Sequence, residues 1–416
     1  MKILVLNSGS SSQKACLYRI GSMLPRHPVT SLWEGRIEWH NGTAIRSIKN
    51  SKGFARENQV RISTCGQMVR DLLTTAWEGE GRAIASCSEI DAVGHRFVHG
   101  GPHFEEPVVI TPEVRQAIAG AAEFAPLHIR AELEGVDTVK GLIGAIPQAA
   151  VFDAGFHRRI PAAASVYPGP YEWLERGIRR YGFHGINHQY CTDRAAQILG
   201  REKAGLRLVI CHLGNGCSLA AVRGGRSVDT TMGFTPLDGL MMGTRSGAVD
   251  PGILTYLMRD GQVRASELDE LLNEKSGLLG ISGLSSDMRD ILTGIQQGHE
   301  RAELAFNIYV HRLRSAIGSM IAVLGGVDAL VFTGGVGENS PDIRQAACRT
   351  FGFLGLRLDR EANARPIFDA DISSVDSRVR VLVIRAEEDW AIATEVWKLT
   401  NARADVTADE RVGLRT

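Results

Sequence analysis

The chain has 416 residues, more than one hydrophobic core usually supports, so its length predicts two domains. Lys plus Arg and Asp plus Glu both number 47, and this zero net charge argues against a global basic field for nucleic acid or an anionic membrane, leaving a small-molecule partner. Seven cysteines without a CxxC pair indicate reduced thiols in a cytoplasmic protein, and we expect neither a signal peptide nor a membrane span.

Strands that end in small or polar residues recur along the chain. Residues 3–7 form an apolar strand, followed by a turn of small residues and a second apolar stretch that reaches Tyr18. Further strands are expected from near Ala145 to Asp153, over residues 206–211, and over residues 329–333. The last two lead into the glycine-rich turns 212–216 and 334–339.

These turns favour phosphate binding. Glycine lets backbone N–H groups approach an anion, and open α/β sheets bind ligands at the carboxyl ends of their strands. Two strand–turn–strand units about 200 residues apart indicate a duplicated domain that holds a nucleotide from both sides. A P-loop is excluded because the chain has no Gly-Lys dipeptide, and the GxGxxG, HExxH and GxSxG motifs are also absent.

Outside these strands and turns, only some segments show an apolar periodicity. Apolar residues at helical spacing from Leu304 to Leu324, before Gly325, predict a core-facing helix with a glycine stop. Residues 230–252 have no periodicity and are typical of a functional loop. Residues 49–61 are expected to be a loop, and the tail after Asn401 a frayed terminus.

Two arginines, a histidine and a metal ion are candidates for phosphoryl-transfer chemistry, which needs in-line positioning and positive charge. Arg96 and Arg245 lie in apolar and glycine-rich surroundings, where a guanidinium can hold a carboxylate or phosphoryl group with two hydrogen bonds. His184 follows Gly182 and Phe183, and Asp153 ends a strand. The structural alternatives are surface arginines, a core histidine and a helix-capping aspartate.

Seven motifs in order resemble the acetokinase family. They are NSGSSS at 7–12, GHRFVHGG at 94–101, RYGFHG at 180–185, HLGNG at 212–216, MGFTPLDGLMMGTRSG at 232–247, SSDMR at 285–289 and FTGGVGENS at 332–340. The resemblance covers nearly the whole chain. It implies an α/β fold of two duplicated ribonuclease-H-like domains of the actin-like ATPase type, with an active-site cleft between them. The expected domains are 1–154 plus 389–416, with the first phosphate hairpin and the acyl substrate, and 155–388, with the nucleotide.

The resemblance also implies roles for individual residues. Asp153, His184, Arg245 and Arg96 would be catalytic, with Arg96 on the substrate carboxylate, Arg245 and His184 on the transferring phosphoryl group, and Asp153 organising charge. A recess for the methyl group of the substrate would be lined by Val98, Leu127, Phe183 and Pro236. Nucleotide-binding residues would be Lys14, His212, Leu213, Gly214, Asn215, Gly216, Asp287, Met288, Arg289, Gly335, Val336, Gly337, Glu338 and Asn339. Asn7 and Glu388 would hold Mg²⁺, or Mn²⁺, directly or through water, with Glu387 as the alternative to Glu388.

The chain departs from the family pattern at four places. Ile129-Arg130 follows Leu127-His128, Ala154-Gly155 follows Asp153, Ile186-Asn187 follows Gly185, and Arg385-Ala386-Glu387 precedes Glu388. The first change adjoins the expected recess, and the others alter the groups around the expected site.

The activity implied by the resemblance is acetate kinase, which transfers a phosphoryl group reversibly between ATP and acetate in a homodimeric enzyme. A propionate or butyrate kinase is the second reading, because one methylene in an apolar pocket is worth only about 1–3 kcal/mol. An actin-like nucleotide switch is a third, and added acetate would not accelerate its nucleotide turnover.

Overall fold

The structure is a computed structural model that describes residues 1–8, 12–40, 43–61, 64–101, 104–123, 126–259, 261, 263–365 and 368–413. It divides into two compact units, Met1–Gly155 with Glu387–Thr416, and Phe156–Ala386. The division expected from the sequence assigns Glu388 to the second domain, whereas the structure places it in the first unit. The reason is that Glu388 begins α15 (Glu388–Gly413), which packs on four strands of the first unit.

The first unit is built on an eight-stranded sheet in the order β5-β4-β3-β2-β1-β6-β8-β7. Strands β1 to β5 form an antiparallel meander, β1, β6 and β8 run parallel, and β7 pairs with β8 in the antiparallel sense. The strands are β1 (Lys2–Ser8), β2 (Ser12–Arg19), β3 (Trp33–His40), β4 (Thr43–Asn50), β5 (Ala55–Val60), β6 (Ala92–Phe97), β7 (Val108–Val109) and β8 (Gln148–Phe152), and the helices besides α15 are α1 (Cys65–Thr74), α2 (Pro112–Gly120) and α3 (Pro126–Ile143), with 3₁₀ segments at Cys87–Glu89 and Ala121–Glu123.

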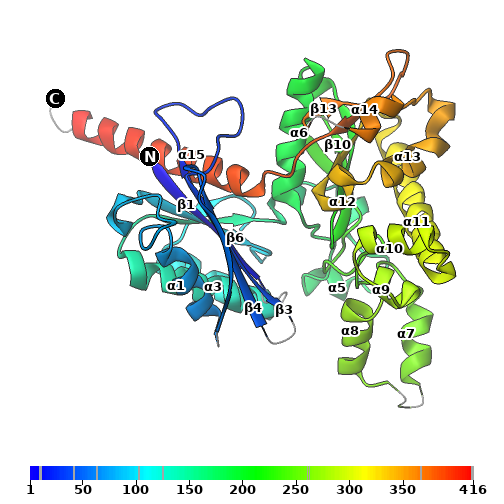
Figure 1. The fold of residues 1–416 in the computed structure, drawn as a ribbon, viewed down its shortest axis with the longest axis horizontal. Coiled ribbons are helices and arrows are strands. Elements are labelled where there is room, and N and C mark those ends of the chain that lie inside the picture. Colours follow the sequence, from blue (N-terminus) through cyan, green and yellow to red (C-terminus); the bar gives the residue numbers. More distant parts are fainter. Residues whose placement is uncertain are drawn as a thin grey trace. The chain divides into compact units, whose positions relative to one another are not determined.

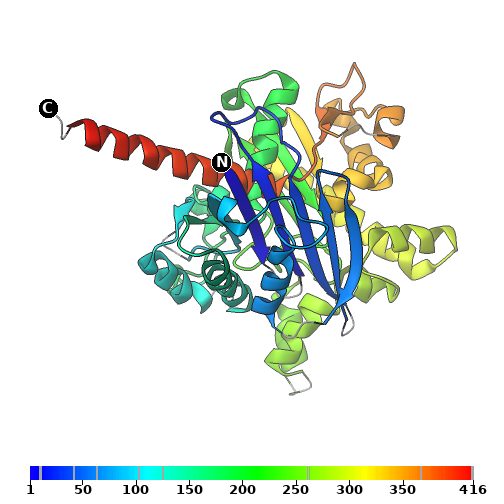
Figure 2. The same cartoon turned by 60° about the vertical axis from the view of Figure 1, so that its left-hand side comes forward.

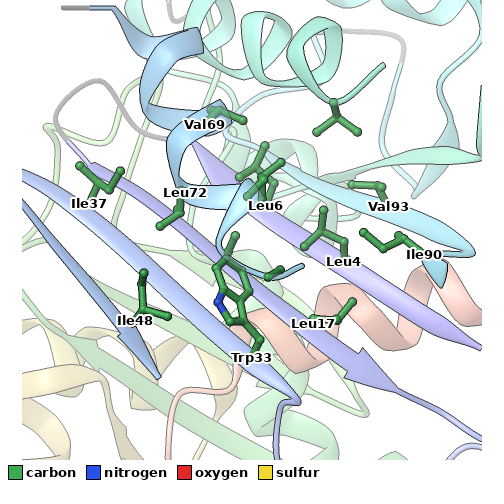
Figure 3. Packing of buried hydrophobic residues seen from close by; sticks show 14 of the residues in the cluster. Leu4, Leu6, Leu17, Trp33, Ile37, Ile48, Val69, Leu72, Ile90 and Val93 are labelled. Carbon is green, nitrogen blue, oxygen red and sulfur yellow. The ribbon is translucent and has the colours of Figure 1, made fainter. Parts of the chain in front are cut away.

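Helices cover both faces of this sheet. Helices α1 and α3 pack on one face over a buried cluster that includes Leu4, Trp33 and Val93 (Figure 3). Side chains alternate between the faces of a strand, and the next residue, Gly94, faces α15 on the other side, where a Cβ would lie 2.7 Å from Ile392 Cγ2. Figures 1 and 2 show α15 (red) crossing the first unit and extending beyond its strands.

The prediction of a loop over residues 49–61 is wrong. Strand β4 ends at Asn50 and β5 covers Ala55–Val60, so this segment is a hairpin at the edge of the sheet. Its β5 side chains are mostly exposed, which explains why the stretch shows no apolar pattern. Likewise, the tail expected to fray after Asn401 continues α15 as far as Gly413.

The second unit repeats the topology of the first. Its six-stranded sheet has the order β11-β10-β9-β12-β14-β13, in which β9, β10 and β11 are antiparallel neighbours and β9, β12 and β14 run parallel. In the first sheet, β3-β2-β1-β6-β8 has the same arrangement as β11-β10-β9-β12-β14. In each sheet the last parallel strand also has an antiparallel neighbour at the edge, which is β7 beside β8 and β13 beside β14. The duplication expected from two hairpins therefore extends across whole sheets.

The strands of this unit are β9 (Arg207–Leu213), β10 (Cys217–Arg223), β11 (Arg226–Thr230), β12 (Ala329–Thr333), β13 (Ala370–Asp371) and β14 (Arg380–Val383). Its helices are α4 (Ala162–Ser165), α5 (Glu172–Glu175), α6 (Gly185–Leu199), α7 (Pro251–Met258), α8 (Ala265–Glu274), α9 (Gly277–Ser282), α10 (Met288–Gln296), α11 (Glu300–Leu324), α12 (Gly334–Asn339), α13 (Pro341–Arg349) and α14 (Arg360–Ala364), with 3₁₀ segments at Gly155–His157, Lys203–Gly205 and Thr350–Leu354. Residues 231–250 contain neither helix nor strand, as expected for the long loop.

Helix α11 confirms the predicted helix and its glycine stop, because Gly325 caps it in the left-handed conformation. The predicted core face is only partly correct. Leu313, Ile317 and Met320 are buried, whereas Leu304 is 52% exposed. Ala302 and Ala305, on either side of Leu304 in the chain, are buried instead. The face of α11 that packs on the protein, including β10, therefore does not include the Leu304 position.

The two glycine-rich turns also differ from expectation. His212 and Leu213 are the last residues of β9, so the turn is limited to Gly214, Asn215 and Gly216. Residues 334–339 form the short helix α12 rather than a turn. Gly334 begins this helix with a φ of 78°, and a Cβ there would lie 2.9 Å from the carbonyl oxygen of Leu213, so glycine is required at this position.

Candidate functional site

In the first unit, three predicted site residues lie at the carboxyl ends of adjacent parallel strands. Asn7 is near the end of β1, Arg96 near the end of β6, and Asp153 directly after β8. The strand registers pair Leu6 with His95 and Arg96 with Val151, which brings the three ends to one edge of the sheet. This edge is where an open α/β sheet binds its ligands.

Arg96 connects the three residues. Its Nη2 atom lies 2.5 Å from Asp153 Oδ2, and its Nη1 atom donates a 3.4 Å hydrogen bond to Asn7 Oδ1. Asp153 is only 1% exposed, and its Oδ1 atom has no hydrogen-bond partner among the described residues. This strand end therefore presents a guanidinium and a buried, unbonded carboxylate oxygen.

Glu132 is a functional candidate that sequence reasoning missed. It lies in α3 and accepts a 3.0 Å hydrogen bond from the backbone N–H of Val98, while its Oε2 atom is buried and has no partner in the described structure. Burial raises the pKa of Glu132 to about 8, against the opposing charge of Arg96. A glutamate on an amphipathic helix carries no sequence signal that it is buried beside a site.

The start of α15 adds two carboxylates, Glu388 and Asp389. Loss of water contact, together with the charge of Asp153, raises the pKa of Glu388 to about 7, and Arg96 acts against this shift. The charges of Arg96 and Asp153 thus both act on Glu388, and the choice between Glu388 and Glu387 as metal ligand stays a prediction. Asp389, missed from the sequence, forms a 2.5 Å ion pair with Lys14, so Lys14 already has an anionic partner.

In the second unit, His184 is positioned by its neighbours. It precedes α6 in the left-handed conformation, with a φ of 57°, which is uncommon for a residue other than glycine. Its Nδ1 atom lies 2.9 Å from Ser218 Oγ, and its ring stacks on His212 with a centroid separation of 4.2 Å. Asn187 Nδ2 donates to His212 Nδ1 over 2.7 Å and to Thr333 Oγ1 over 3.3 Å. One departure from the family pattern, Asn187, therefore fixes the ring beside His184.

Arg245 approaches the same place from the long loop. A Cβ at Gly216 would lie 3.5 Å from Arg245 Nη1 and 3.5 Å from His184 Nε2, so these two nitrogens meet at the predicted phosphate turn. Arg245 donates a 3.3 Å hydrogen bond to the carbonyl oxygen of Pro236, and within the described ranges it has no carboxylate partner. Burial lowers the pKa of its guanidinium. A desolvated cation without a counter-ion is well suited to bind an anion.

The other predicted nucleotide residues are in varied environments. Asp287 caps α10 through a 2.8 Å bond from the backbone N–H of Arg289, whose guanidinium also bonds Asp287, and Met288 is buried. In α12, Glu338 Oε1 accepts hydrogen bonds from the backbone N–H groups of Gly334 and Ala386. Gly335 and Asn339 are exposed, Gly337 is buried, and Val336 is intermediate. Asp287 and Glu338 thus form hydrogen bonds within the protein. Their contacts with a nucleotide stay a prediction.

The residues expected to form the methyl recess are distributed over both units. Val98, which is buried, belongs to the first unit, whereas buried Phe183 and half-buried Pro236 belong to the second. Leu127 falls in α3, but its side chain lies outside those described. The recess therefore stays a prediction.

Two other expectations from the sequence concern the cysteines and the helices. None of the seven cysteines, all of which the structure describes, forms a disulfide. Over the described ranges, every helix is too short or too polar to cross a membrane.

The chain matches known proteins over nearly its whole length. The family model described as "Acetokinase family" matches residues 2–394. The acetate kinase of Trichormus variabilis is 56% identical over 405 residues, covering 96% of this chain and 100% of that protein. Among solved structures, an acetate kinase from Porphyromonas gingivalis matches with a TM-score of 0.88 at 39% identity, covering 96% of this chain and 99% of the other. A propionate kinase from Francisella tularensis matches with a TM-score of 0.86 at 36% identity, covering 95% and 99%.

These matches confirm the resemblance inferred from the seven motifs and the duplicated actin-like ATPase fold. The chain belongs to the acetokinase family.

Proposed function

We propose that the chain catalyses the reversible transfer of the γ-phosphoryl group of ATP to acetate, giving ADP and acetyl phosphate by direct in-line transfer. The observation that carries this proposal is that Arg245 Nη1 and His184 Nε2 both lie beside Gly216, each 3.5 Å from the position of a Cβ there. Phosphoryl transfer requires positive charge and hydrogen-bond donors around the equatorial oxygens of the transferred group. Arg245 and His184 supply both, while Arg96 would hold the carboxylate of acetate.

A hydroxamate-coupled assay tests this proposal. The purified protein is incubated with ATP, Mg²⁺ and acetate, propionate or butyrate, and hydroxylamine converts any acyl phosphate into a coloured hydroxamate. We expect kcat/KM to be highest with acetate. A maximum with propionate would favour the activity named for the Francisella tularensis structure. Nucleotide hydrolysis that no acid accelerates would instead indicate an ATPase switch.

We further propose that Mg²⁺ acts with ATP, held by Asn7 and Glu388. No three His, Cys, Asp or Glu side chains of the described chain are grouped as a metal site. Magnesium, however, usually needs only one or two protein ligands beside phosphate oxygens and water. The donors fit in kind, because Asn7 and Glu388 offer oxygens, the charge of Asp153 acts on Glu388, and Asp153 Oδ1 has no hydrogen-bond partner among the described residues. The ion would neutralise charge on the ATP phosphates.

The magnesium proposal is tested by Glu388→Gln. We expect the Mg²⁺ concentration for half-maximal activity to rise at least tenfold, whereas Glu387→Gln should leave it within twofold. A larger effect of Glu387→Gln would transfer the metal role to Glu387.

The enzyme is proposed to act as a cytoplasmic homodimer, and helix α7 supports the self-association. Six of its eight residues, Pro251–Met258, are apolar, yet none is buried, and Ile253, Tyr256 and Met258 are exposed. Several exposed apolar side chains on one helix are typical of an interface. Light scattering after chromatography should give the mass of two chains, and Tyr256→Glu should shift it towards one. A monomeric parent protein would overturn this part of the proposal.

A further inference from the structure

The hydroxyl group of Ser218 lies between two histidine nitrogens. Ser218 is on β10 and is fully buried; its Oγ atom is 2.9 Å from His184 Nδ1 and 2.8 Å from His188 Nε2. A serine hydroxyl has one proton to donate and lone pairs to accept. The two histidine nitrogens are its only hydrogen-bond partners among the described residues, so if it accepted an N–H from both rings its own buried proton would have no acceptor. Ser218 therefore donates to one histidine and accepts an N–H from the other, and the two ring tautomers depend on each other.

His188 determines the direction of this chain of hydrogen bonds. It is fully buried in α6, and burial, together with the charges of His157 and His212, lowers its pKa well below the usual range, so its ring is neutral and carries one N–H. Its Nδ1 atom is buried and has no hydrogen-bond partner among the described residues. Because a buried N–H without an acceptor is rarer than an under-satisfied acceptor, the proton belongs on Nε2. His188 therefore donates to Ser218.

We propose that Ser218 and His188 are positioning residues that hold His184 in the tautomer with its proton on Nε2. The Ser218 hydroxyl, which accepts from His188, donates its proton to His184 Nδ1. Because Nδ1 accepts this bond it carries no proton, and the N–H of the His184 ring then lies on Nε2. This inference rests on the proposed function, because Nε2 is the atom that meets Arg245 Nη1 at Gly216.

The tautomer matters for the charge that develops during transfer. With the proton on Nε2, His184 and Arg245 direct two N–H donors at the oxygens of the phosphoryl group. With the proton on Nδ1, Nε2 would direct a lone pair at the same oxygens and repel them. The left-handed backbone of His184, at a φ of 57°, is unfavourable for a non-glycine residue and agrees with a ring held in place for function.

The direct test is the tautomer of His184 in the full chain. The 12 histidines are labelled with ¹⁵N, and proton–nitrogen correlation spectra distinguish Nδ1–H from Nε2–H rings. A His184→Gln spectrum assigns the His184 signals. We expect Nε2–H in the parent protein and a mixture of tautomers in Ser218→Ala, with Ser218→Thr like the parent. A parent His184 ring with its proton on Nδ1 would overturn the inference.

Kinetics give the second readout. Ser218→Ala should lower kcat about tenfold or more, towards the loss caused by removing one preorganised donor, with the KM values for acetate and ATP within about twofold. His188→Gln keeps a donor near the Nε2 position and should stay close to the parent, whereas His188→Ala should behave as Ser218→Ala. Unchanged kcat and tautomer in Ser218→Ala would refute the positioning role. If the parent phosphorylates no acid, the proposed function fails, and the spectra still decide the tautomer.

Discussion

Arg96 and Asp153 form an ion pair across two adjacent strand ends, with 2.5 Å between Arg96 Nη2 and Asp153 Oδ2. Asp153 is buried and Arg96 is 18% exposed, so neither charge is well solvated. The pair holds the guanidinium beside Asn7 before any substrate arrives.

Replacing one member of this pair should affect both stability and activity. Asp153→Asn leaves the Arg96 charge without its partner, which costs about 3–5 kcal/mol for a buried pair, and kcat should fall severely. The double variant Arg96→Met with Asp153→Asn should recover part of the melting temperature, because neither charge then remains unpaired. It should recover no activity, because both proposed catalytic side chains are gone. Thermal unfolding and the hydroxamate assay separate the effects. A double variant less stable than Asp153→Asn would show that the unpaired Arg96 charge is not the source of the lost stability.

Arg245→Ala should lower kcat by about 10²-fold or more, by analogy with loss of one preorganised electrostatic donor. Thermal stability should change little, because Arg245 has no carboxylate partner in the described parts of the chain. Arg357→Ala is the matched control, since its exposed ion pair with Asp376 is remote from these groups in the sequence and solvated. Normal turnover in Arg245→Ala would remove this residue from the catalytic set.

The raised pKa of Glu132, about 8, predicts a pH-dependent stability. Between pH 4.5 and 8 the unfolded chain releases this proton and the folded chain keeps it, so folding stability falls as pH rises, by up to about 1.4 kcal/mol per pH unit. Glu132→Gln resembles the protonated side chain and removes this dependence. From pH 5.5 to 7.5, its melting temperature should rise relative to the parent by about 5 °C, which follows from about 2 kcal/mol in a unit of this size. Parallel pH curves for the two proteins would contradict the assignment.

Val98→Ala tests the predicted recess. A larger cavity should favour propionate by about tenfold in the ratio of kcat/KM values, since one methylene is worth about 1–3 kcal/mol. Val93→Ala, in the buried cluster of the same unit, is the matched control and should lower stability without altering this ratio. If Val98→Ala, like Val93→Ala, lowers stability and leaves the ratio of kcat/KM values unchanged, Val98 is an ordinary core residue.

The sequence by itself determined the family, the duplicated fold and the strands that deliver the site. Each of these depends on local patterns, because an apolar run followed by glycine or a polar residue specifies a strand end whatever surrounds it. Helix α11 and its Gly325 stop were predictable for the same reason. The hairpin β4–β5 was not, because an exposed edge strand lacks the apolar alternation that reveals a strand.

Only the tertiary structure decided which charges and hydrogen bonds occupy the site. The partners of Lys14 and Val98 are Asp389 and Glu132, and Ser218 lies between His184 and His188, although these residues are far apart or unremarkable in the chain. A burial pattern predicts which face of an element is covered, but not which side chain from a distant element covers it. The same contacts remove water from Glu132 and Glu388 and raise their pKa values, a property that no single residue carries in its sequence position.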